Sequence, residues 1–305
     1  MNEISKQIIG AVSDFSESFR GAFNIREDGK CVGRQSSKNI QILPKKDKPG
    51  LDIIISPETD GESVYIPACV THGNEDDLVY NDFFVGEGAK VTIVAGCGVH
   101  TTTGEPARHN GIHRFFLRPG SHVKYVEKHI GLGKGVGLRS IDPVTEAELG
   151  ENSVLEMDTA QIGGVDKTLR KTRAVCQKGA KLIIRERILT EKDQTAVTDF
   201  LVELNGEGSG ADIVSRAVAR GESHQEYSSV IVGNAACSGH SECDAIIDGK
   251  ATVDAAPKLC ANCCDAALIH EAAIGKIAGE QIIKLRTLGL TEEEAESRII
   301  EGFLN

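Results

Sequence analysis

The sequence predicts a mainly β protein built as a solenoid, because a strand-like unit recurs about every thirty residues and the middle of the chain shows no long helical pattern. The repeat begins at Gly88, Gly120, Gly150, Gly179 and Gly210, which are 32, 30, 29 and 31 residues apart. After each glycine, apolar residues alternate with polar ones, the pattern of a strand with one face in the core. A content of 33 glycines suits the many tight turns that such a stack needs.

The length of the repeat narrows the architecture. A propeller blade of four strands usually needs 40 or more residues, whereas about thirty residues suit one coil of a parallel β-helix with two or three short strands. A β-sandwich with regularly spaced hairpins is the alternative. The ends of a solenoid must be covered or they pair with another chain, so we expect a homodimer through an end or edge of the stack.

We divide the chain into an N-terminal helix and mixed entry region at 1–80, a β-helix core at 81–265 and a helical region at 266–305. Within the entry region, residues 44–50 (PKKDKPG) read as a loop. Residues 2–20 form a weak amphipathic helix, with apolar side chains at Ile4, Ile8, Val12 and Phe15.

Two helices are expected after the core. The first starts at about Ala266, and Gly289 suits the position just after its end. Thr291 and Glu294 have the spacing of a capping box that begins the second helix. The short connection predicts an antiparallel helical hairpin, which caps the last coil or docks a partner. Helical spacing is seen for Ile274, Ile277, Ile282 and Leu285, and an apolar side for Ile299, Ile300 and Phe303.

Composition excludes several classes of function. A formal net charge of −11, without a run of Lys or Arg, argues against binding nucleic acid or an anionic membrane. No apolar run approaches 18 residues, which argues against a membrane span, and the N-terminus lacks the pattern of a signal peptide. Nine cysteines without a secretion signal are expected to be reduced thiols in the cytoplasm. The chain contains neither a Walker phosphate loop nor a Gly-x-Ser-x-Gly elbow.

The main candidate site is a stretch that gathers thiolate, imidazole and carboxylate, the ligands of iron, zinc and iron–sulfur clusters. Cys243 lies in a predicted strand, and a buried structural cysteine is the alternative. His270 and Glu271 open the predicted helix, where a carboxylate is often only a companion of the helix dipole. The auxiliary candidates are Cys237, Cys260, Cys263 and Cys264, which include one C-x-x-C spacing.

A second, weaker metal candidate combines Cys97 and His100 with His109 and His113, whose spacing resembles a zinc site. These residues lie in Gly96-Cys97-Gly98 and His109-Asn110-Gly111, which look like turns, where histidines often bond only to the backbone.

The C-terminal part resembles the SufB/SufD family, the β-helical scaffold subunits of the SUF system for iron–sulfur cluster assembly. The residues that carry the resemblance are 239–247 (GHSECDAII), 268–281, 288–295 and 300–303. Residues 21–133 look like the short archaeal-type branch. The resemblance implies a right-handed parallel β-helix, and it places Cys243 on the SufB cysteine of cluster building and His270 and Glu271 on the His-Glu pair beside it.

The family implies a cluster scaffold that is not itself an enzyme. Its cargo is a transient 4Fe–4S or 2Fe–2S cluster, and its partners are a SufC-type ABC ATPase that hydrolyses ATP, a sulfur donor and acceptor apoproteins. The chain lacks the long N-terminal region of a full SufB, which favours a homodimer in place of the SufB–SufD heterodimer. A SufD-like structural partner without a cluster, and a metal-dependent carbohydrate-active β-helix enzyme, are the alternatives. We expect the ATPase to contact Ile274, Ile277, Gln281, Leu285, Leu288, Ile299 and Phe303.

Overall fold

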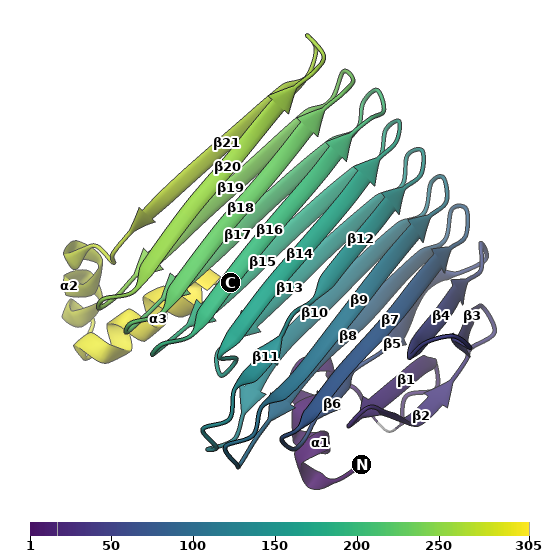
Figure 1. Ribbon diagram of the computed structural model, residues 1–305. Helices are drawn as coiled ribbons and strands as arrows, with labels where there is room; N and C mark the ends of the chain where they lie inside the picture. The colour runs from purple at the N-terminus through teal and green to yellow at the C-terminus, as the bar shows by residue number, and fades with distance from the viewer. Residues whose placement is uncertain (17, 305) are drawn as a thin grey trace.

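A computed structural model describes residues 1–16 and 18–304, and it shows two large sheets stacked face to face with helices at both ends (Figure 1). Through most of the chain, successive strands alternate between the two sheets, and each strand pairs in parallel with the strand of the next coil. This arrangement is a parallel β-solenoid, as the repeat predicts. In the described residues, antiparallel pairing occurs only in β1–β2 and β3–β4, so the β-sandwich of hairpins was wrong. No helix in the described part of the chain has the length and apolar character needed to cross a membrane.

One sheet, which we call sheet A, runs in the order β2-β1-β5-β8-β10-β13-β15-β17-β19-β21, with β6 beside β1 and β8. Its strands are β1 (Ala22–Glu27), β2 (Lys30–Gln35), β5 (Asp60–Tyr65), β6 (Ala68–Val70), β8 (Lys90–His100), β10 (His122–Leu132), β13 (Val154–Ile162), β15 (Lys181–Thr190), β17 (Gly210–Ala219), β19 (Ser238–Ile247) and β21 (Ala267–Gly275).

The other sheet, sheet B, runs in the order β20-β18-β16-β14-β11-β9-β7-β4-β3, with β12 beside β9 and β14. Its strands are β3 (Ile40–Pro44), β4 (Gly50–Ile55), β7 (Glu75–Val85), β9 (Ala107–Leu117), β11 (Arg139–Ile141), β12 (Val144–Leu149), β14 (Lys167–Cys176), β16 (Thr195–Leu204), β18 (His224–Gly233) and β20 (Thr252–Ala261).

The coils differ in one respect from the sequence expectation. From β13 onward each coil contains two strands of nine or ten residues, not two or three short ones. Alternate residues of these strands point between the sheets and are buried, as along β16. The core is therefore one continuous layer of inward-facing side chains that runs the length of the stack.

The turn that leads into sheet A explains the glycine repeat and corrects two of its positions. A left-handed backbone conformation recurs at Gly88, Gly120, Asn152, Gly179 and Gly208. Asn152, not Gly150, is the left-handed residue of its turn, because asparagine tolerates this conformation better than most residues. Gly210 is not the turn residue of its coil but the first residue of β17, paired with Lys181.

The N-terminal helix α1 (Glu3–Ser13) confirms the amphipathic helix predicted within 2–20, but it ends before Phe15. It packs on β8 with Ile8 and Val12 buried. A Cβ atom at Gly96 would lie 2.5 Å from Val12, and one at Gly98 would lie 2.2 Å from Ile8. Both glycines therefore face the helix, and the intervening cysteine faces the core. The segment 96–98 is strand, not the turn we expected, and 109–111 is likewise part of β9.

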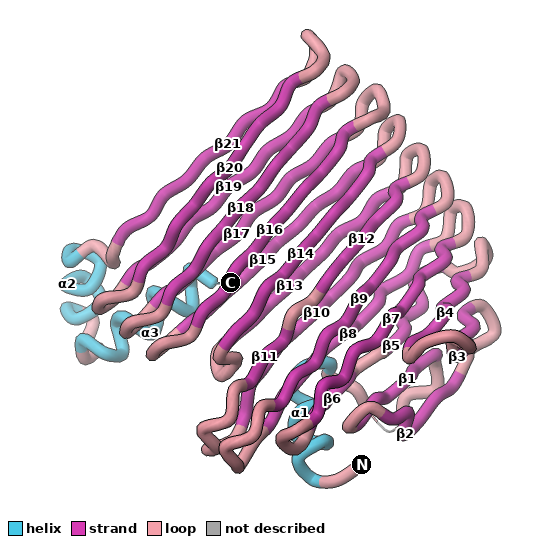
Figure 2. Tube along the Cα trace, in the orientation of Figure 1, coloured by secondary structure: helices cyan, strands magenta, loops and turns pink. Residues whose placement is uncertain are grey.

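The C-terminal region is helical only after residue 278. Residues 267–275 form β21, which pairs with β19, so the prediction of a helix from about Ala266 was wrong. The two helices that follow, α2 (Gly279–Thr287) and α3 (Glu292–Leu304), confirm the predicted pair. The capping box is present as hydrogen bonds from the Thr291 amide to Glu294 and from the Glu294 amide to the Thr291 hydroxyl. Figure 2 shows both helices at the end of the stack where β21 lies.

Candidate metal centre at the open end of the solenoid

The last coil leaves one end of the stack uncovered. In the described residues, β20 and β21 are the terminal strands of their sheets, and each pairs with a neighbour on one edge only. Most side chains of β21 are exposed, because no further coil packs beside its free edge. Cys243, one coil further in, is 1% exposed and faces the core.

The register between β19 and β21 places the predicted ligands. Ser241 pairs with His270, Glu242 with Glu271 and Cys243 with Ala272. Since neighbours in register share a face, His270 lies on the inner face with Cys243, whereas Glu271 lies on the outer face with Glu242. The three predicted ligands of one chain therefore lie on both faces of the sheet at its uncovered edge.

The thiol of Cys243 is in an environment that keeps it protonated. Burial raises its pKa to about 12, and the nearby carboxylates of Glu186 and Asp244 act in the same direction. A lone nucleophile is therefore disfavoured at neutral pH. Binding of a metal cation would reverse this, because the cation holds the deprotonated thiolate directly.

On the outer face, ligand atoms of His240, Glu242 and Glu271 lie within 4.8 Å of one another. The Nδ1 atom of His240 lies 2.8 Å from Oδ1 of Asp212, on the neighbouring strand β17. Burial acts to raise the pKa of Asp212, but the hydrogen bonds with His240 and Arg185 outweigh it and lower the pKa. Sequence reasoning selected only Glu271 of this group, although the His240-x-Glu242 spacing places both side chains on one face of a strand.

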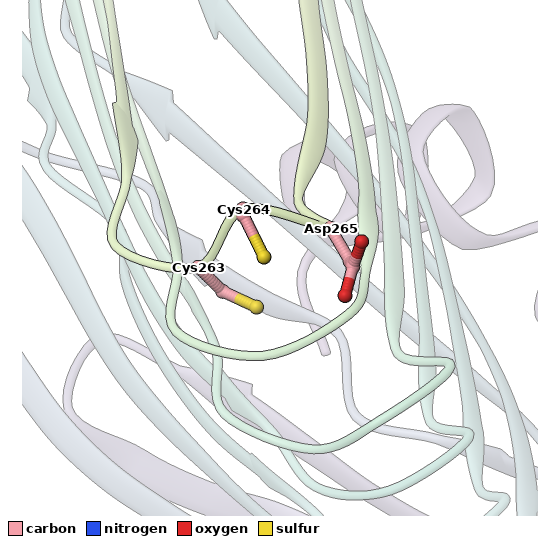
Figure 3. Close-up of side chains that lie close together, drawn as sticks. All are labelled: Cys263, Cys264 and Asp265. Atoms are coloured by element: carbon pink, nitrogen blue, oxygen red, sulfur yellow. The ribbon is translucent and has the colours of Figure 1, made fainter.

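Two of the auxiliary cysteines, Cys263 and Cys264, lie at the turn between β20 and β21, not beside Cys243. Figure 3 shows Cys263 and Cys264 gathered with Asp265, and their ligand atoms lie within 4.8 Å of one another. Ala267, next to this turn, pairs with Ser238, five residues before Cys243 in β19, which corresponds to roughly 16 Å along the strand. The turn thiols therefore form a separate group.

The two other auxiliary thiols lie near the same end of the coils. Cys237 is buried in the turn one coil below, and the electrostatic influence of Cys263 contributes, after burial, to raising its pKa. Cys260 is at the end of β20. The turns themselves are aligned by a ladder of amides: Asn262 donates to Asn234, and Asn234 donates to Asn205, at 2.7 Å in both cases.

The second candidate group does not assemble. Nδ1 of His100 lies 3.1 Å from the Thr71 carbonyl oxygen, and Nδ1 of His113 lies 2.7 Å from the Tyr125 hydroxyl. Cys97 instead lies near His109 and His129, both of which act on its thiol electrostatically. Burial acts to raise the pKa of Cys97, but these two histidines outweigh it and lower it to about 7. Within the described residues, Cys97, His100, His109 and His113 do not form one ligand group.

A line of buried polar side chains inside the solenoid was missed by sequence reasoning. Glu127 lies 3.4 Å from His129 and 2.7 Å from Arg170, and Arg170 lies 3.3 Å from Glu186. Glu186 in turn accepts a hydrogen bond of 2.8 Å from Ser215, the strand neighbour of Cys243. The available signal was the spacing by two residues that puts Glu127 and His129 on the same face as the core residues Val123 and Tyr125.

Fold and site together define a parallel β-solenoid with thiol, imidazole and carboxylate groups around the end at which β20 and β21 lie. Residues 75–303 match the family model described as SUF system FeS cluster assembly, SufBD core domain, and the chain therefore belongs to the SufBD family.

Several curated archaeal proteins of this family are similar to the chain. A protein of Methanothermobacter thermautotrophicus, named iron-sulfur cluster assembly SufBD family protein, is 30% identical over 249 residues, 79% of this chain and 58% of the relative. A protein of the same name from Archaeoglobus fulgidus is 29% identical over 231 residues, 75% of this chain and 61% of the relative. One from Methanocaldococcus jannaschii is 25% identical over 240 residues, 77% of this chain and 74% of the relative. The chain thus spans about three-fifths of the length of the first two.

Proposed function

We propose that this protein is a scaffold on which an iron–sulfur cluster is assembled, held by the open end of the solenoid and then released. The observation that carries the proposal is the pairing of β19 with β21, which brings Cys243 and His270 to the inner face and Glu271 to the outer face of one uncovered edge. Thiolate, imidazole and carboxylate are ligands that iron accepts. A mixed set binds a cluster less firmly than four thiolates, which suits a cargo that must leave.

The full ligand set is proposed to come from two chains. A single chain supplies one buried thiol near the edge, while the turn thiols lie roughly five residues of strand away. The free edges of β20 and β21 are templates for pairing with another chain. Association of two copies through this end would cover the exposed strand and bring two sets of Cys243, His270 and Glu271 together. All nine cysteines are free thiols, in keeping with a reducing cytoplasm.

A SufC-type ATPase is proposed to dock on the C-terminal helices and to hydrolyse the ATP that rearranges the scaffold. Of the predicted docking residues, Ile277 and Phe303 pack against the solenoid together with Ile300 and Leu304. Leu288 remains 75% exposed, and Ile283 of α2, which the sequence did not select, is 62% exposed. These two apolar side chains are the best candidates for direct contact with the ATPase.

The scaffold role is tested by anaerobic reconstitution with ferrous ion and sulfide. Wild-type protein should develop absorbance near 400 nm (roughly, for thiolate-bound clusters), and Cys243→Ala should lose most of it. Cys176→Ala is the matched control, because Cys176 is also buried in the core with a pKa raised to about 12. Full absorbance in Cys243→Ala, or equal loss in both variants, would refute the site.

Docking is tested by pull-down with a SufC-type ATPase. Ile283→Asp together with Leu288→Asp should weaken capture at least about tenfold, since buried apolar anchors dominate such interfaces. Val136→Asp is the control, because Val136 is 92% exposed and lies in the loop between β10 and β11, outside α2 and α3. Capture that survives the double substitution would exclude α2 as the docking element.

A further inference from the structure

We propose that His240, Glu242 and Glu271 form a binding site for one divalent first-row metal ion on the outer face of sheet A. This site shares Glu271 with the proposed cluster ligands but does not include the thiol of Cys243. The three residues come from two neighbouring strands, and their ligand atoms lie within 4.8 Å of one another. Such a spacing is small enough for one cation to contact all three. Cys243 points to the opposite face of β19, so the ligand set contains no thiol.

The histidine is already oriented for this role. Its Nδ1 atom is engaged by Asp212 at 2.8 Å, which leaves Nε2 as the free ring nitrogen. A carboxylate that holds the second nitrogen of a metal-binding histidine fixes the tautomer and the orientation of the ring. Asp212 is itself held by Arg185, so the positioning residue is anchored from the far side.

The two carboxylates lie close together without an ion-pairing lysine or arginine in the described chain, and Asp244 adds a further carboxylate near Glu242. Glu242 and Glu271 are neighbours in register, and like charges placed in this way repel each other. In the described part of the chain, no lysine or arginine forms an ion pair with either of them. The nearest bases are occupied elsewhere, since Arg185 pairs with Asp212 and Arg216 donates to the Phe303 carbonyl oxygen at 3.2 Å. A bound dication would neutralise the pair.

The chemistry of the ligands selects the ion. One imidazole with two carboxylates suits Mn²⁺, Fe²⁺, Co²⁺ or Zn²⁺ and, lacking sulfur, does not favour Cu⁺ or a preformed cluster. The ligand set is argued from the structure alone. The choice of ferrous ion as the biological occupant rests on the proposed function. An iron held on the outer face at the same edge would be a store beside the thiol at which the cluster is built.

The test uses Mn²⁺ alone as the probe, because this ion prefers oxygen and nitrogen to thiolate. The full chain is titrated with Mn²⁺, and free ion is counted from its electron paramagnetic resonance signal. We expect one ion bound per chain, and a loss of affinity of at least about tenfold in His240→Gln, Glu242→Gln and Glu271→Gln. Asp212→Asn should weaken binding by roughly 10–100-fold, the usual effect of removing an orienting partner.

Two controls make the outcome decisive. Glu156→Gln removes a carboxylate that pairs with His122 at 2.6 Å on sheet A but, in the described chain, belongs to no group of three ligands. This variant should bind Mn²⁺ as the wild type does. Cys243→Ala should also keep Mn²⁺ binding while losing the cluster absorbance, which separates failure of this site from failure of the scaffold role. Circular dichroism checks that each variant retains its β structure. The proposal would be overturned if the wild type did not bind Mn²⁺ stoichiometrically, or if the three ligand variants kept the wild-type affinity. Unchanged affinity in Asp212→Asn would show that Asp212 does not position the histidine.

Discussion

At the scale of single residues, burial decides the chemistry of the interior histidines. His113 is fully enclosed and lies near Tyr125, Asn81, Glu127, His109 and His129. Burial lowers its pKa to about 4, with the neighbouring positive charges of His109, His129 and Arg170 adding to the effect and Glu127 opposing it. His113 is therefore a neutral hydrogen-bonding residue at physiological pH.

This environment predicts a loss of stability in mild acid. The pKa of His113 in the folded chain lies below its unfolded value of 6.5, so above pH 6.5 this histidine does not lower the stability. As the pH falls from 6.5 toward 4, only the unfolded chain takes up the proton, and the free energy of unfolding decreases. The full loss is roughly 3 kcal/mol. Urea unfolding at pH 7 and pH 4.5 should show a smaller difference for His113→Gln than for the wild type. An identical pH dependence in both proteins would contradict the assignment.

Arg170 is the charge on which the buried polar line depends. It lies between Glu127 and Glu186, and all three side chains are almost completely buried. Arg170→Met would leave Glu186 without a cation and Glu127 with His129 alone. It should lower the free energy of unfolding by about 3–5 kcal/mol, as breaking a buried pair does. Arg173→Met, at the partly exposed pair with Asp199, should cost less than about 1 kcal/mol. Equal losses in the two variants would contradict this account.

At the scale of elements, close packing of α1 on β8 explains why cysteine stands between two glycines in the segment 96–98. Gly98→Ala would place a Cβ atom 2.2 Å from Ile8 and should destabilise by about 1–3 kcal/mol through overpacking. Gly10→Ala meets no atom within 4 Å and should stabilise α1 by roughly 0.5–1 kcal/mol, because alanine favours the helix. Thermal unfolding measures both. A neutral Gly98→Ala would mean that the helix is not seated on this strand.

The elements also show where sequence patterns are sufficient. The recurring turn and the alternation of apolar residues predicted the solenoid, because burial between two sheets imposes the same pattern on every coil. The capping box predicted the start of α3, because its hydrogen bonds are local. The helical spacing of Ile274, Ile277, Ile282 and Leu285 led us to expect a helix from about Ala266. The segment 267–275 instead makes its backbone hydrogen bonds with β19, which local patterns do not reveal.

The candidate site was predicted only in part for the same reason. Cys243, His270 and Glu271 could be selected by residue type and family resemblance. Their distribution over the two faces of the sheet depends on the register of β19 with β21. The same register brings His240 and Glu242 close to Glu271, so this group of three could not be predicted from the sequence either. Likewise, the contact of Cys97 with His129 rather than His100 follows from the stacking of strands β8 and β10.

At the scale of the whole molecule, the two ends of the stack are not alike. At the N-terminal end, the parallel stack stops at β1 and β4, each of which pairs with an antiparallel terminal strand (β2 and β3), and α1 packs over β8. At the C-terminal end, β20 and β21 keep free edges in the described chain, and α3 packs beside β17 instead of covering them. This asymmetry leaves the edge that carries the candidate site as the surface through which two copies are proposed to associate.

Native mass spectrometry of the anaerobically reconstituted protein tests this central claim most directly, because it counts chains and clusters in the same particle. We predict that the cluster is carried by a particle of two chains and is absent from the single chain, and that Cys243→Ala lacks it in both. A cluster carried stoichiometrically by single chains, or by Cys243→Ala dimers, would contradict an assembly site completed by a second copy at the open end of the solenoid.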